Sequence, residues 1–176
     1  MLEEIIKSAF TIVPIIIGLS LLKKEMSKKV EPQPDGSFEL RISRMYFFTG
    51  LVCASIFLFF TGWILLDPDT PSEDRILGLF FLSLSLLGVY LILLYRNYRL
   101  YFDNENIVVT NLYGKKKSLK WSEIEKVRSN PFTGYLTLSS ASTQLKVHQN
   151  LKGMVAFKKV MEAQTKWTAK ELRLPY

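Results

Sequence analysis

Apolar residues gather in the first half of the chain, where two long stretches, 45–66 and 76–95, contain no Asp, Glu, Lys, Arg or His. A helix of roughly 20 apolar residues crosses the hydrocarbon core of a bilayer. Two buried core helices would instead need a large polar domain around them, which a chain of 176 residues does not supply. The pattern therefore predicts a transmembrane helical hairpin over residues 45–95. The second stretch contains small residues that permit close helix contact, and ordinary packing within the hairpin explains them equally well: Gly78, Ser83, Ser85 and Gly88.

A third apolar stretch, at residues 5–22, has more than one interpretation. It contains Pro14, which membrane helices tolerate better than soluble ones. A signal peptide would begin with basic residues, but Glu3 and Glu4 stand there, and two lysines follow where a small-residue cleavage site is expected. We therefore predict a retained first transmembrane helix within residues 1–22, with an interfacial or cleaved segment as the alternative.

Basic residues are unevenly distributed among the segments that connect the apolar stretches. Residues 23–44 are rich in Lys and Arg, whereas the acidic connection 67–75 contains Arg75 as its only basic residue. Because Lys and Arg resist translocation, the basic loop and the chain after Arg96 are both predicted to be cytoplasmic. This prediction holds for two spans as well as for three. It places a multi-pass protein in the cell (plasma) membrane with its C-terminal domain inside.

After Arg96, apolar and polar residues alternate with a period of two, which is typical of β-strands. Tight turns are expected at residues 103–106 and at Tyr113–Gly114. Alternating stretches that we interpret as strands are residues 99–103, 107–113, 116–121, 135–139 and 144–148. Residues 38–42, FELRI, are a further candidate strand that would add to this sheet at the membrane surface. Between the predicted strands 116–121 and 135–139, Ser122 and Glu125 have the spacing of a capping box, which predicts a short helical turn or a bulged strand.

Beyond residue 148 the apolar period becomes that of a helix. The recurring residues are Leu151, Met154, Val155, Val160, Met161 and Trp167. They predict an amphipathic helix of about four turns that closes the open end of a small curved sheet. The predicted fold class is thus an α+β membrane protein: two or three transmembrane helices, then an antiparallel β-barrel or sandwich of six or seven strands with a C-terminal helix. The predicted parts are a first transmembrane helix (1–22), a basic cytoplasmic loop (23–44), a transmembrane helical hairpin (45–95), a cytoplasmic domain (96–168) and a tail (169–176).

Residues that could carry chemistry are sparse. The chain has one cysteine, Cys53, and one histidine, His148, which the alternation places on the outward face as a solvated residue. The sequence shows no acidic pair, Cys/His cluster, nucleophile elbow or phosphate-binding glycine loop. The two spans contain no charged residue of the kind that marks an ion path. We therefore expect a protein that is not an enzyme and binds no cofactor or metal.

The net charge of +7 comes mainly from the C-terminal half. Candidate contacts to lipid headgroups lie on one predicted hairpin: Lys115, Lys116, Lys117 and Lys120. Each basic residue near an anionic leaflet contributes about 1 kcal/mol to binding. The alternative is that these lysines, with Lys158 and Lys159 on the helix, are simply solvated on the cytoplasmic side. Nucleic acid is not an expected partner, because no basic stripe is interleaved with aromatic residues in this tethered domain.

The stretch from Tyr98 to Lys166, in particular YFDNENIVVTNLYGKKKSLKWSEIEKV, resembles bacterial pleckstrin-homology (PH-like) domains. The shared pattern is an apolar strand, a glycine-bearing turn, a basic strand, and Trp121-Ser122 leading into Ile124 and Val127. Such domains are often fused behind a pair of membrane spans. The resemblance implies a PH-like fold, which serves mainly as a platform for binding.

Three functions are compatible with these features. The first is a non-catalytic, membrane-anchored interaction module, a scaffold or accessory subunit of a bacterial membrane complex that binds a membrane or cytoplasmic protein. The second is a domain that senses anionic lipid at the inner leaflet. The third is a regulatory subunit of a membrane transporter or enzyme. The sequence leaves the partner and the oligomeric state open.

Overall fold

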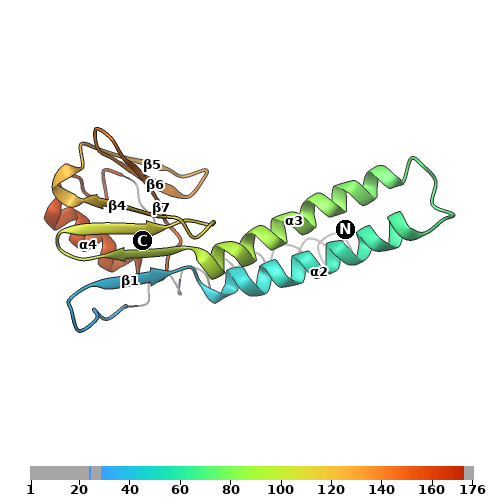
Figure 1. The fold of residues 1–176 in the computed structure, drawn as a ribbon, viewed down its shortest axis with the longest axis horizontal. Helices are drawn as coiled ribbons and strands as arrows, with labels where there is room; N and C mark the ends of the chain where they lie inside the picture. The colour runs from blue at the N-terminus through green and yellow to red at the C-terminus, as the bar shows by residue number, and fades with distance from the viewer. Residues whose placement is uncertain (1–23, 25–28, 173–176) are drawn as a thin grey trace, which may run out of the picture. The chain divides into compact units, whose positions relative to one another are not determined.

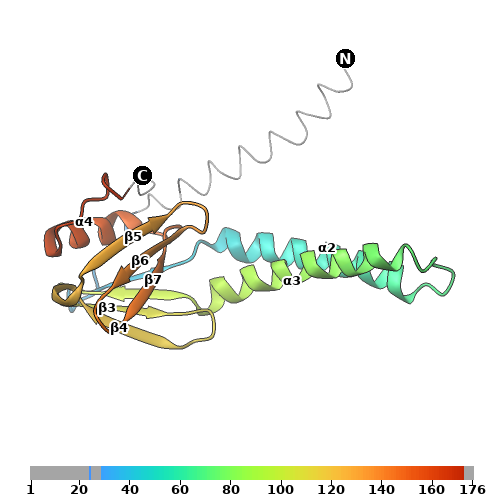
Figure 2. The same ribbon diagram turned by 90° about the horizontal axis from the view of Figure 1, so that it is seen from above.

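The computed structural model describes Lys24 and residues 29–172, which fall into two compact units (Figures 1 and 2). Residues 44–98 and 110–115 form a helical unit, and residues 29–43, 99–109 and 116–172 belong to a sheet unit. The predicted first span within residues 1–22 lies outside the described residues, as does the end of the predicted tail. The class is α+β, with two long apolar helices followed by sheets and a C-terminal helix.

The helical unit contains α2 (Arg44–Leu66) and α3 (Arg75–Asn97), which confirms helices over both uncharged stretches. Each has 23 residues and is about 35 Å long at about 1.5 Å per residue. Both are therefore long and apolar enough to cross a membrane. In the turn between them, Asp67 Oδ1 accepts a hydrogen bond from the backbone N–H of Asp69 at 3.1 Å.

Small residues bring α2 and α3 close together. A Cβ atom added to Gly88 would lie 2.6 Å from Ala54 N and 2.7 Å from Gly50 O, so both backbones meet where neither glycine can be replaced without a shift. Ser85 Oγ donates to Ala54 O at 3.3 Å across the same contact. Gly88 and Ser85 therefore serve packing within the hairpin, which is one of the two interpretations drawn from the sequence. Ser83 does not take part, because its Oγ donates within its own helix to Phe80 O at 2.7 Å.

The sheet unit contains seven strands in the part of the chain that the structure describes. A four-stranded sheet has the order β1 (Phe38–Arg41), β2 (Arg99–Phe102), β3 (Asn106–Thr110) and β4 (Lys116–Lys120). An antiparallel three-stranded sheet has the order β5 (Lys126–Asn130), β6 (Tyr135–Ser139) and β7 (Gln144–His148). The candidate strand FELRI is confirmed as β1, which pairs antiparallel with β2 and places Phe38 opposite Phe102. The seven strands agree with the six or seven expected.

The segment between the sheets forms a helical turn and then a strand. The 3-10 helix η1 spans Trp121–Glu123, so the expected helical turn is confirmed. The capping box predicted from Ser122 and Glu125 is wrong, because Ser122 lies inside this helix and the Glu125 N–H donates to Ser139 O at 2.9 Å. It is Glu123 that reaches back, accepting the Lys120 N–H at 3.5 Å.

The core of the sheet unit is built from the inward faces of both sheets and one face of α4 (Met154–Gln164). Strand residues predicted to face inward are buried, namely Leu100, Phe102, Leu119, Leu136, Leu138, Leu145 and Val147. Phe157 of α4 is fully buried, and its ring meets those of Phe102 and Trp121 at centroid distances of 5.3 and 5.6 Å. Trp121 satisfies its indole N–H by donating to Asp103 O at 2.8 Å. The helix thus closes the sheets, as predicted.

The extent and inward face of α4 differ from the prediction. The helix has 11 residues, about three turns and not four. It begins after Gly153, whose φ of 82° is left-handed, and it ends at Thr165, which is extended, so Trp167 lies outside it. The inward residues are Met154, Phe157, Lys158 and Met161. Val155, expected on this face, is 42% exposed.

Candidate interaction surfaces

The four lysines named from the sequence lie on the β3–β4 hairpin and are all exposed. Lys116, Lys117 and Lys120 belong to β4, whereas Lys115 ends the preceding turn. Because side chains alternate along a strand, Lys116 and Lys120 share the outward face, and Lys117 lies on the face of buried Leu119. The lysines are therefore spread over two faces of one hairpin and do not form a single pocket.

The turn of this hairpin is fastened to the end of α3 within the helical unit. Asn97, the last residue of α3, donates from Nδ2 to Leu112 O at 2.7 Å. Inside the turn, Asn111 Oδ1 accepts the N–H groups of Tyr113 and Lys115 at 2.9 and 3.0 Å. Tyr113 is 80% exposed at the tip. An exposed tyrosine and a lysine are thus held beside the terminal residue of an apolar helix.

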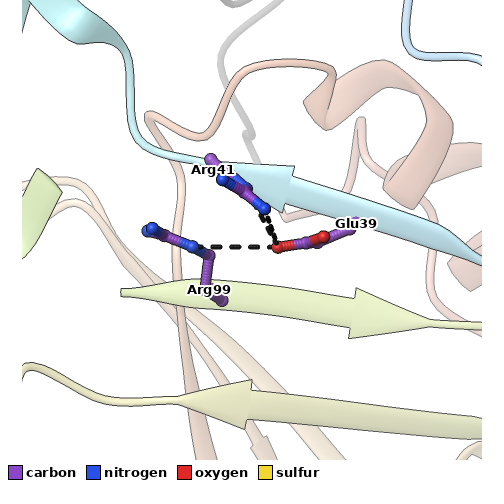
Figure 3. A network of polar contacts seen from close by, with 3 residues as sticks. All are labelled: Glu39, Arg41 and Arg99. Carbon is purple, nitrogen blue, oxygen red and sulfur yellow. Dashed lines mark hydrogen bonds and ion pairs between the residues drawn. The ribbon is translucent and has the colours of Figure 1, made fainter. Parts of the chain in front are cut away.

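Two arginines meet at one end of the four-stranded sheet, where Arg41 of β1 lies directly opposite Arg99 of β2. Figure 3 shows both guanidinium groups directed at Glu39. Glu39 Oε1 lies 2.9 Å from Arg41 Nη2 and 3.7 Å from Arg99 Nε. The carboxylate of Glu39 thus lies between two cationic side chains. In sequence, Arg41 precedes α2 and Arg99 follows α3 by a few residues.

His148 is buried, so its prediction as a solvated surface residue is wrong. Its ring packs edge-on against Tyr135, its partner in the β6–β7 register, at a centroid distance of 4.9 Å. His148 Nδ1 accepts the N–H of Asn150 at 3.1 Å, which assigns the proton of the neutral ring to Nε2. Burial lowers the pKa of His148 to about 4. The reason for the error is local: His148 is the last residue of β7, and the chain that follows folds over it.

Lys158 also departs from its predicted place, because it is only 8% exposed on the inward side of α4. Burial lowers the pKa of Lys158, and the nearby charge of Glu162 opposes that effect. Of the two helix lysines considered as surface charge, Lys159 alone is exposed. Among the described residues, no group of three or more His, Cys, Asp or Glu side chains is placed to hold a metal ion.

Sequence reasoning missed one conspicuous surface residue, Phe132 in the β5–β6 turn, which is 98% exposed. The available signal was its setting, Asn130-Pro131-Phe132-Thr133-Gly134, in which turn-forming residues enclose one large apolar side chain. Single exposed apolar residues are common on proteins, but a fully exposed phenylalanine at the tip of a turn is a candidate contact.

Comparison with known proteins finds no family model, no curated protein and no solved structure that matches the chain. The resemblance to PH-like domains therefore stays a prediction.

Proposed function

We propose that this protein is a membrane-anchored, non-catalytic interaction module. In this proposal α2 and α3 cross the plasma membrane, and the sheet unit is a cytoplasmic PH-like domain that binds a protein partner as a scaffold or accessory subunit of a membrane complex. The observation that carries it is the distribution of polarity in the helical unit, where large apolar side chains face outward.

That distribution argues for lipid as the surroundings of the helices. Outward residues include Phe48, Phe59, Trp63, Leu66 and Ile76, each at least 61% exposed. Only 11% of the most apolar stretch of α2 and 17% of that of α3 is buried, whereas the core helix of a soluble protein is mostly buried. The residues that are buried are mostly small or polar, such as Gly50, Thr61 and Ser85. Membrane helices pack through such residues because lipid already satisfies their apolar ones.

The sheet unit supports the PH-like part of the proposal by its order of elements. It has a four-stranded sheet, a three-stranded sheet and a closing helix, and its buried Trp121 agrees with the resemblance. The turn at Gly114, which joins β3 to β4 and belongs to the helical unit, also agrees with it. Two titratable residues of this unit, His148 and Lys158, are buried and contribute to its packing. Strand β5 forms one edge of its sheet, and such edges bind extended peptides.

The orientation rests on charge. The sheet unit and the basic segment before it carry most of the lysines and arginines, whereas the α2–α3 turn is acidic. The positive-inside bias therefore favours a cytoplasmic sheet unit and an external turn.

Topology is tested with single cysteines in a full-length Cys53→Ser background. Asp69→Cys in the α2–α3 turn is expected to react with a membrane-impermeant thiol reagent added to intact cells, and Ala141→Cys in the β6–β7 turn only after permeabilisation. Labelling of both from outside, or release of the protein from membranes by alkaline carbonate, would contradict the anchor and its orientation.

Partner binding is tested separately by photo-crosslinking in native membranes. A photoreactive residue replacing Lys126, exposed on β5 at the end away from the β5–β6 turn, is expected to give one discrete heavier species that is absent when the probe replaces Phe48 on the outward face of α2. Crosslinks to lipid only, at both positions, would argue against the interaction module while leaving the anchor intact.

A second candidate function is contact with anionic lipid through Lys115, Lys116 and Lys117. It is favoured by the Asn97–Leu112 hydrogen bond, which holds the start of this basic segment at the end of α3. In nanodiscs that contain a spin-labelled anionic lipid, replacing the three lysines by Gln should release bound lipid, with an effect that fades in high salt. A variant with Lys126→Gln, Lys159→Gln and Lys170→Gln, which removes three charges elsewhere on the exposed surface, serves as the matched control. If the control variant releases as much lipid as the hairpin variant, the binding depends on the overall charge of the protein and not on the hairpin, and this candidate function is contradicted.

A further inference from the structure

The β5–β6 turn holds Phe132 outward by a defined hydrogen-bonding pattern. Asn130 Oδ1 accepts the N–H groups of Phe132 and Thr133 at 2.9 and 3.1 Å. Gly134 closes the turn with a φ of 66°, a left-handed conformation that favours glycine, and its N–H donates to Asn130 O at 3.0 Å. The aromatic ring is therefore presented on a built turn, and 98% of its surface is exposed to water in the isolated chain.

The same turn lies at the end of the sheet unit from which the chain enters α2. The Gln149 N–H donates to Gly134 O at 2.7 Å, which ties the turn to the end of β7. Two residues later, Leu151 bridges to Ile42 just beyond β1, so at most about 7 Å of chain separates the two contacts. Ile42 is followed by Ser43 and then by the first residue of α2. Figure 2 shows the β5–β6 turn and the exit of the blue β1 strand at the same end of the sheet unit.

Cationic side chains accompany the turn on the three-stranded sheet. Arg128 of β5 lies opposite Thr137 of β6, which in turn lies opposite Lys146 of β7. Because residues in such a row share one face, Arg128 and Lys146 place positive charge on one surface of the sheet, and both are exposed. Arg128 is two residues from Asn130, where the turn begins. Surfaces that contact the interfacial layer of an anionic bilayer typically combine an exposed aromatic residue with nearby basic residues, as this turn does.

We propose that Phe132 enters the interfacial layer of the bilayer that α2 and α3 cross, and so makes a second membrane contact of the sheet unit. The inference rests on the proposed membrane anchor. It names a contact distinct from the lysine hairpin, made by an apolar side chain and not by charge alone. The bilayer is favoured over a protein partner because Phe132 lies at the end of the unit where the chain enters a helix with an apolar exterior.

The test uses the full-length Cys53→Ser protein in vesicles that contain anionic lipid, with an environment-sensitive dye on Thr133→Cys. This position is exposed and adjacent to Phe132, so the ring itself is retained. The dye is expected to emit at shorter wavelength, to be quenched by spin labels on lipid chains, and to be protected from an aqueous quencher. Phe132→Ser in the same protein should abolish all three effects. The control dye at Ala141→Cys, exposed in the β6–β7 turn at the other end of the same strands, should show none of them.

The outcomes separate the two proposals. If the protein does not insert into vesicles, the anchor fails. If it inserts but the dye at residue 133 is as accessible to the aqueous quencher as the dye at residue 141, the Phe132 contact is overturned and the anchor stands. Protection from the aqueous quencher without quenching by lipid labels would also overturn it, because the turn would then contact protein, such as a second copy.

Discussion

The two units of this protein distribute polarity in opposite ways. In the sheet unit Leu100, Leu136 and Phe157 are fully buried, whereas lysines such as Lys116 and Lys126 are exposed. In the helical unit Gly88 and Ser85 are buried, while Phe59 is 61% exposed. The outer surface of the sheet unit suits water, and that of the helical unit suits the lipid in which we propose that it lies. The sheet unit folds by removing apolar surface from water, whereas the hairpin is held by close backbone approach, which is how helices associate in lipid.

The largest expected effect comes from the core of the sheet unit, through Phe157→Ala. Phe157 is fully buried against Phe102 and Trp121, so truncation leaves a cavity and should cost about 3–5 kcal/mol of unfolding free energy. Chemical unfolding in detergent, followed by tryptophan fluorescence, measures it. Val155→Ala on the same helix, where the side chain is 42% exposed, should change stability far less. Equal losses from the two variants would refute the assigned inward face of α4.

Phe157 also shows where sequence reasoning on α4 failed. The predicted helix begins at Leu151, whereas α4 begins only after the left-handed Gly153. This early start places Val155 on the predicted inward face, although Val155 is exposed. The inward position of Phe157 depends on its contact with Phe102, a residue of β2 that is distant in sequence. Helical periodicity can identify an amphipathic helix, but its inward face depends on where the helix begins.

Other features were predictable to different degrees for physical reasons. The two membrane-length helices follow from uninterrupted apolar runs, and β2, β6 and β7 from clean alternation. Strand β5 has a weak pattern, because Val127 is its one buried apolar residue, and its pairing with β6 supplies the rest. For the lysine hairpin, the sequence predicted a strand and exposure. The fastening of its turn by Asn97 is a tertiary contact that no local pattern indicates.

The second effect concerns pH and should appear in the sheet unit alone. The pKa of His148 falls from 6.5 in an unfolded chain to about 4 in the fold. Below pH 6.5 the unfolded state therefore binds a proton that the folded state does not, so stability should fall as the pH is lowered from 6.5 toward 4. The full loss is about 3 kcal/mol at about 1.4 kcal/mol per pKa unit. His148→Gln, which cannot titrate, should flatten this part of the pH–stability curve. An unchanged slope would mean that other groups cause it.

The third prediction addresses the helical unit through Gly88→Ala. The new Cβ would lie 2.6 Å from Ala54 N, a backbone atom, so the helices must separate. Overpacking of this kind costs about 1–3 kcal/mol. The measurement is SDS-induced unfolding in mixed micelles, with tryptophan fluorescence as the signal. Gly62→Ala is the matched control, because its Cβ would meet only Leu66 Cδ1 at 3.9 Å. If both variants behave alike, close approach of the helices is not what holds the hairpin.

The smallest expected effect separates two serines of α3 that look equivalent in sequence. Ser85 Oγ donates across the helix contact to Ala54 O at 3.3 Å, whereas Ser83 Oγ donates to Phe80 O of its own helix. Hydrogen bonds between membrane helices contribute about 0.6 kcal/mol on average, so Ser85→Ala should weaken the hairpin by about that amount and Ser83→Ala should not. Both are measured in the same SDS titration. Ser85 is buried in the helix contact and Ser83 is exposed, so a loss confined to Ser85 would show that a polar group between the helices helps to hold α2 against α3.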